Sequence, residues 1–314
     1  MKKYFSLVVL ACLPFSVRAE LLPLDEALRA TYVACVGIDD KLSEYKTLAG
    51  INTAVSGVGT GLGAGATVVG IVKYQKDKEA ASYEKLLEQL REKTKHAEFG
   101  DLSDSDVASF EQEFNLSYSA AVSDIDKYEK ELEALNKKSK NLGNWRTGLL
   151  AGSTATNVAG AVLAAKSGAD DSIQGMINVC LKAVDDLNNS MMQARINGQD
   201  ISEAKEIVAQ CREYSNVDAS SIKKRAKGAE ISSIVGASTG LTGTVVSGVA
   251  NSDKIRNDNT DAGKQKEKNL NTASNVLAGA TTVASATSTV FSATQIAAIK
   301  RVANIAAKCE GVLK

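Results

Sequence analysis

The chain has 314 residues, and its 37 basic and 37 acidic side chains leave a formal net charge of zero. Without excess positive charge the chain lacks the basic surface that nucleic-acid binding requires, so we expect no nucleic-acid partner. Two prolines and 5% aromatic residues are too few for an all-β domain, whereas abundant Ala, Leu, Glu and Lys favour long helices.

The first 19 residues, MKKYFSLVVLACLPFSVRA, have the form of a bacterial secretory signal peptide. Two lysines precede an apolar run that ends at the small residue Ala19, and this run is too short to span a bilayer. The tetrapeptide VLAC, which ends at Cys12, also resembles a lipoprotein signal. We expect export to the periplasm or cell envelope of a bacterium, with lipidation of Cys12 as the less favoured alternative.

Four cysteines follow the predicted signal peptide: Cys35, Cys180, Cys211 and Cys309. An even number of cysteines in an exported chain favours two disulfides. Four cysteines allow three pairings, and their spacing alone does not choose among them.

Four stretches of the chain contain no Asp, Glu, Lys or Arg. They are residues 47–72, 147–165, 231–252 and 269–299. A long charged region separates the first two stretches, and a short one separates the last two.

The two halves of the chain repeat short motifs. TGLGAGATVVG, from Thr60, is similar to TGLTGTVVSG, from Thr239, and KNL precedes LAG in both halves. We interpret this as an internal duplication of an antiparallel helical hairpin, with chance similarity between biased helical sequences as the alternative. The predicted domains are a signal peptide (1–19), a first hairpin (20–172), short connecting helices (173–214) and a second hairpin (215–314).

Folding each hairpin about its centre determines which cysteines face each other. In the second half this register brings Cys211 beside Cys309, and in the first half it brings Cys35 within a few residues of Cys180. The favoured disulfides are therefore Cys35–Cys180 and Cys211–Cys309. The main alternative joins Cys180 to Cys211 and Cys35 to Cys309.

The stretch GVGTGLGAGATVVG, residues 57–70, holds six glycines within a predicted helix. Gly57, Gly61 and Gly65 recur every four residues, and Gly59 and Gly63 form a second track on another face. Six glycines cost about 5 kcal/mol relative to alanine in a helix interior, so close helix contact must offset them. We expect both tracks to form a glycine zipper against two neighbouring helices, as in a four-helix bundle.

A heptad repeat in the last charge-free stretch predicts which of its residues meet a neighbouring helix. Val276, Val283 and Val290 are seven residues apart, with a companion line of small residues. We expect the valines and this companion line to form a thin, tightly packed coiled-coil core.

Lipid is an alternative environment for these stretches. Small residues four apart also pack transmembrane helices, and stretches of 19 to 31 residues are long enough to cross about 30 Å of hydrocarbon. In residues 47–72, however, sixteen residues are Gly, Ala, Ser or Thr and only nine are large aliphatics. Strong transmembrane segments are mostly large and apolar, so membrane insertion is the less favoured interpretation.

The charged region between the first two stretches predicts a coiled-coil arm over about residues 73–140. Apolar residues at heptad spacing run through 105–149 with charges around them, and 73–98 supplies the facing helix. This arm is a solvated hairpin or a binding site for a protein partner. The only tryptophan, Trp145, is expected to anchor the arm to the bundle, with an interfacial membrane role as the alternative.

The sequence contains no recognisable arrangement of catalytic or metal-binding residues. His96 is the only histidine, so neither a Ser–His–Asp arrangement nor a metal-ligand spacing is present. The glycine-rich stretch also lacks the Lys and Ser/Thr of a phosphate-binding loop. We therefore expect no enzyme and no catalytic, cofactor-binding or metal residue.

Together these patterns predict an all-α fold, an elongated bundle of two duplicated hairpins with Gly/Ala/Ser/Thr-rich packing faces, the first extended as a coiled-coil arm. We expect a non-enzymatic protein of the periplasm or cell envelope that is structural or binds a partner through its arm. The alternative is a membrane-active protein that inserts Gly-rich hairpins and is either pore-forming or membrane-anchored. Homo-oligomerisation is left open.

Overall fold

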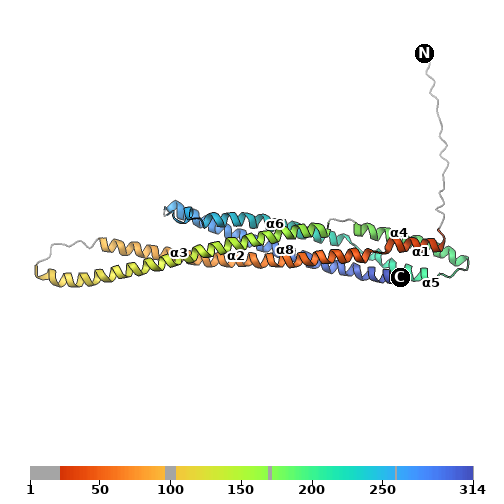
Figure 1. The fold of residues 1–314 in the computed structure, drawn as a ribbon, viewed down its shortest axis with the longest axis horizontal. Helices are drawn as coiled ribbons and strands as arrows, with labels where there is room; N and C mark the ends of the chain where they lie inside the picture. The colour runs from red at the N-terminus through yellow and green to blue at the C-terminus, as the bar shows by residue number, and fades with distance from the viewer. Residues whose placement is uncertain (1–21, 96–103, 169–171, 259, 314) are drawn as a thin grey trace, which may run out of the picture. The chain divides into compact units, whose positions relative to one another are not determined.

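The computed structural model describes residues 22–95, 104–168, 172–258 and 260–313, and within these ranges it contains helices and no strand (Figure 1). The elements are α1 (Leu24–Cys35), α2 (Ile38–Lys95), α3 (Asp104–Gly168), α4 (Ser172–Ile196), α5 (Ser202–Cys211), the 3-10 helix η1 (Arg212–Asn216), α6 (Ser220–Ala250), α7 (Asp253–Arg256) and α8 (Asp261–Leu313). The prediction of an all-α fold is confirmed.

The chain divides into two compact units that alternate along the sequence. Unit 1 comprises residues 1–41, 172–217 and 302–314, and unit 2 comprises residues 42–171 and 218–301. Helices α2 and α8 therefore contribute to both units. The two predicted hairpins follow one another along the chain, which differs from this alternating arrangement. The duplication of the hairpins stays a prediction.

The described part of unit 1 has an apolar core. Buried Ile38, Ile177, Val184, Leu187 and Ile207 come from α2, α4 and α5. The outer faces of α4 and α5 carry charged side chains, namely Lys182, Asp185, Asp186, Glu203, Lys205 and Glu206. Large apolar residues thus form the core of unit 1, although Val33, Val179 and Ile196 are 79%, 59% and 85% exposed.

Unit 2 is an antiparallel four-helix bundle in which α2, α3, α6 and α8 follow one another around the axis. Hydrogen bonds join each helix to the next: Ser153 Oγ to the carbonyl of Gly59 (2.9 Å), Thr147 to Ser247 (2.9 Å), Ser233 to Ser288 (2.8 Å) and Asn52 to Ser292 (2.7 Å). Because the side chains at these interfaces are small, neighbouring helices approach closely enough for such hydrogen bonds to form.

Buried residues in unit 2 recur at alternating spacings of three and four, which is coiled-coil packing. In α6 they are Ile222, Ala226, Ala229, Ser233, Gly236, Gly240, Gly243, Ser247 and Ala250. The heptad period predicted for residues 269–299 is therefore present.

The predicted phase of that heptad is wrong. Val276, Val283 and Val290 are 67%, 66% and 62% exposed, and the companion line of small residues is also exposed. The buried line consists of Ser274, Ala278, Thr281, Ser285, Ser288 and Ser292. The reason is steric, because helices that approach closely leave room only for small side chains at the contact.

The arm predicted for residues 73–140 corresponds to the long extensions of α2 and α3. Ala80 and Leu87 of α2 are buried, and the rings of Tyr83 and Tyr128 lie 5.7 Å apart. An ion pair between Lys264 and Glu84, at 3.0 Å, joins α8 to the arm. His96 lies outside the described residues.

Candidate functional site: a charge-free level of the bundle

The four charge-free stretches lie side by side in unit 2, and we call this part of the bundle the charge-free level. Asn157 Nδ2 lies 2.9 Å from Ser285 Oγ, and a Cβ on Gly236 would lie 2.7 Å from Asn157 Oδ1. A Cβ on Gly59 would lie 2.7 Å from Thr156 Oγ1. Each of these residues lies in the interior of its stretch, so the four stretches overlap along the bundle axis. The shortest, 147–165, is about 28 Å long at 1.5 Å per residue.

The inside of this level is built mainly from small and hydroxyl- or amide-bearing side chains, with Leu150 and Ile299 as buried large aliphatics. Ser288 Oγ lies 3.1 Å from Ser56 Oγ and 2.8 Å from Ser233 Oγ, and Asn52 Nδ2 donates to Ser292 at 2.7 Å. These side chains are buried and hydrogen-bonded to one another, so their burial carries little desolvation penalty. Helix association at this level therefore depends on close backbone approach and on hydrogen bonds.

The outside of the same level is apolar. Sixteen large aliphatic side chains on all four helices are between 37% and 67% exposed. They are Ile51, Val58, Val68, Ile71, Val72, Val158, Val162, Ile231, Ile234, Val235, Leu241, Val245, Val249, Val276, Val283 and Val290. In this part of unit 2 the large aliphatic side chains thus lie mostly on the outside, whereas the core of unit 1 is built from them.

Charged residues begin directly at both ends of the level. Lys46, Lys166 and Lys300 border it at one end, and Lys73 and Lys268 border it at the other. Trp145, beside the second end, is 69% exposed, so the expectation that it anchors the arm by burial is wrong. An exposed tryptophan next to an apolar surface is the arrangement found at membrane–water interfaces.

A partly buried ionic cluster around the buried Lys73 lies at the arm end of the level. Lys73 Nζ lies 2.7 Å from Asp77 Oδ2 and 3.6 Å from Glu267 Oε1, and Arg256 Nη1 lies 3.8 Å from the same Glu267 oxygen. Arg256 Nη1 also donates to Ser139 Oγ at 3.2 Å. Burial raises the pKa of Glu267, and Lys73 opposes this shift. The sequence did not indicate this cluster, because its members are far apart in the chain.

The structure separates the two predicted glycine tracks. Gly59 and Gly63 lie at helix contacts, where an added Cβ would be 2.7 Å from Thr156 Oγ1 and from Thr282 Oγ1. Gly57 and Gly61 face outward with no atom within 4 Å of an added Cβ, and Gly65 would only touch the side chain of Leu149 at 3.5 Å. The prediction of close helix contact is therefore wrong for Gly57 and Gly61, because the contact surface follows the alternating three-and-four spacing.

The matched pair Gly63→Ala and Gly61→Ala tests this assignment. Gly63→Ala also brings a Cβ to 3.2 Å from the Thr282 Cα, so α2 and α8 must move apart, and we expect a loss of about 1–3 kcal/mol. Gly61→Ala meets no atom and removes a helix-weakening glycine, so we expect a gain of up to about 1 kcal/mol. Thermal unfolding followed by circular dichroism measures both. Equal melting temperatures for the two variants would contradict the assignment.

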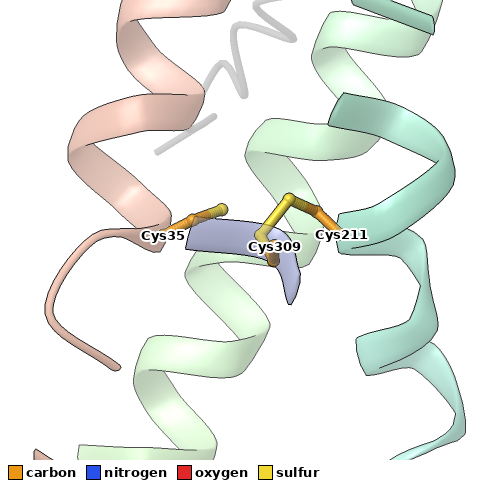
Figure 2. A group of neighbouring side chains, drawn as sticks. All are labelled: Cys35, Cys211 and Cys309. Atoms are coloured by element: carbon orange, nitrogen blue, oxygen red, sulfur yellow. A yellow bond between two sulfur atoms is a disulfide. The ribbon is translucent and has the colours of Figure 1, made fainter. Parts of the chain in front are cut away.

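Two buried disulfides join the helices of unit 1. The structure pairs Cys35 with Cys180 and Cys211 with Cys309, the two pairs that the hairpin register favours. The cysteines belong to α1, α4, α5 and α8, and all four are fully buried. Figure 2 shows Cys35, Cys211 and Cys309 directed toward one another. Their sulfur atoms all lie within 4.8 Å of one another.

Comparison of the chain with protein-family models, curated proteins and solved structures gave no match.

Proposed function

We propose that this protein is an exported, membrane-embedded helical bundle that acts as a non-enzymatic anchor for its charged arm. The charge-free level of unit 2 lies in the hydrocarbon layer, with its aliphatic side chains against lipid. The sequence left open partner binding at the arm and membrane anchoring, and this proposal combines the two. The observation that carries the proposal is the position of the large aliphatic side chains of the level, which lie mostly on its outside.

In water, burial of apolar surface would contribute little to the assembly of such a bundle. A helical bundle in water buries large apolar residues at its heptad positions and exposes charged ones, as burial of apolar surface provides about 25 cal/mol per Å². At this level the buried residues are mostly Gly, Ala, Ser, Thr and Asn, with Leu150, Gln295 and Ile299 as larger exceptions, while sixteen large aliphatics face outward. Unit 1 of the same chain buries large aliphatic residues in its core, although it also exposes Val33, Val179 and Ile196, so composition bias alone does not produce a core of small residues.

Lipid accounts for both faces of the level. Helices in a membrane associate through small residues and interhelical hydrogen bonds, and they expose aliphatic side chains to the acyl chains. Four helical stretches are long and apolar enough to cross a membrane by length and composition, and each contains one charge-free stretch. The shortest stretch matches the roughly 30 Å thickness of a hydrocarbon core.

The antiparallel order of the helices gives the topology that follows from this proposal. The stretch ends at residues 72, 147, 252 and 269 lie at one end of the charge-free level. The stretch ends at residues 47, 165, 231 and 299 lie at the other. The proposal therefore places the charged arm on one side of the membrane. The other four ends of the charge-free stretches lie on the opposite side.

An alkaline carbonate wash of membranes from cells that export the full chain tests the proposal. We expect the protein to stay in the pellet and to be extracted by detergent. The same wash with Cys12→Ser removes a lipid anchor as an explanation, and we expect unchanged retention. Release of the wild-type protein by carbonate would contradict membrane embedding, as would retention that disappears in the Cys12→Ser variant.

A further inference from the structure

The two disulfides of unit 1 lie next to each other in its core. Cys35 belongs to the first disulfide, yet its sulfur lies within 4.8 Å of both sulfurs of the second, those of Cys211 and Cys309. Cys180 is bonded to Cys35 and completes the group. The sulfurs of Cys35, Cys211 and Cys309 therefore lie close together in the core (Figure 2), and that of Cys180 is bonded to the first of them.

We propose that the reduced form of this cluster binds one soft divalent metal ion, such as Zn²⁺, through the thiolates of Cys35, Cys180, Cys211 and Cys309. Zn–S bonds of about 2.3 Å in a tetrahedron place the sulfurs roughly 3.8 Å apart. The sulfurs of Cys35, Cys211 and Cys309 already lie within 4.8 Å of one another. The proposal requires that, once both disulfides are open, side-chain rotation brings the sulfur of Cys180 and the other three to this spacing.

The chemistry of the cluster selects the kind of metal. Thiolates prefer soft and borderline ions, whereas Ca²⁺ and Mg²⁺ require oxygen ligands. All four cysteines are fully buried, which favours the neutral thiol when no metal is bound. Metal binding therefore has to displace the four thiol protons, and proton release is part of the expected signature.

The exchange between the two states is balanced. A phosphine reductant takes one water for each disulfide and becomes a phosphine oxide, so two equivalents yield four thiols. Binding of the metal releases four protons. Two equivalents of a small disulfide oxidant later restore both protein disulfides, release the metal ion and leave four small-molecule thiolates. Unit 1 is thus held together at the same position by either covalent bonds or a metal. This inference does not depend on membrane embedding.

The test uses the full mature chain, reduced with a trialkylphosphine and titrated with Cd²⁺. We expect one Cd²⁺ per chain after gel filtration, thiolate-to-metal charge-transfer absorption in the ultraviolet, and about four protons released. The oxidised chain should retain none. The reduced chain should melt at a lower temperature than the oxidised chain and should recover on Cd²⁺ addition.

Single variants separate a built site from unspecific thiol binding. Cys180→Ser and Cys309→Ser should each weaken Cd²⁺ binding at least tenfold in the reduced chain, whereas Ser190→Ala, elsewhere in α4, should not. Failure of the reduced chain to retain Cd²⁺ would overturn the proposal. Equal binding by the single-cysteine variants, or no thermal recovery with Cd²⁺, would overturn it too.

Discussion

Replacing Val283 by lysine is expected to release the protein from membranes. Val283 lies near the middle of the last charge-free stretch and is 66% exposed on the outer face of α8. A lysine at the centre of a membrane-spanning helix costs about 2.5–3.5 kcal/mol on insertion scales. The fraction of Val283→Lys that resists carbonate extraction should therefore fall sharply relative to the wild-type protein.

The same substitution has a different outcome if the bundle resides in water. An exposed valine on a helix in water is replaced by lysine at a cost within about ±0.5 kcal/mol, and the product is more soluble. Val283→Leu keeps the site apolar, and Ala134→Lys adds the same charge at an exposed position of the arm. Both controls should remain membrane-bound. Retention of Val283→Lys at the wild-type level would rule out lipid contact at this face.

Removing the Cys35–Cys180 disulfide is expected to unfold the N-terminal helix of unit 1. The crosslink closes a sequence separation of 145 residues, for which the chain-entropy model gives roughly 5 kcal/mol, within the 2–5 kcal/mol typical of native disulfides. Helix α1 has 12 residues, and helices of this length are marginal alone in water. In Cys35→Ala/Cys180→Ala, α1 depends on its buried Ala27 and on a hydrogen bond from Thr31 to the carbonyl of Ala183.

Hydrogen exchange measures this effect locally. We expect the amides of residues 24–35 to lose protection in the double variant, while the amides of the charge-free level keep theirs. Cys211→Ala/Cys309→Ala is the matched control, because it removes the other crosslink and leaves α1 tied to α4. Unchanged protection of α1 in Cys35→Ala/Cys180→Ala would show that packing alone holds this helix.

Several features of the fold follow from local sequence and were predicted. The scarcity of proline and the helix-forming composition predict long helices, and the structure has them. The heptad period is present in unit 2, and the charge-free stretches lie side by side. These features are readable because helix propensity and side-chain period act between residues that are close in the chain.

The buried charges were not predicted, and the helix contacts predicted for Gly57 and Gly61 are wrong. Lys73 and Arg146 border charge-free stretches and are 1% exposed, although lysine and arginine are rarely buried. Lys73 is buried because α8 supplies Glu267 from nearly 200 positions away, and Arg146 donates to the carbonyl of Asn271 at 3.2 Å. Such partners are invisible in a local window of sequence.

The sequence by itself determined the helical class of this protein, the period of its heptads and the extent of its charge-free stretches. Only the tertiary structure decided their phase, placing Ser274 and Ser288 inside and Val276, Val283 and Val290 outside. A period of seven is the same whichever face of the helix is buried. The choice of face depends on how closely the neighbouring helices approach and on what surrounds them, and these conditions exist only once the four helices are assembled.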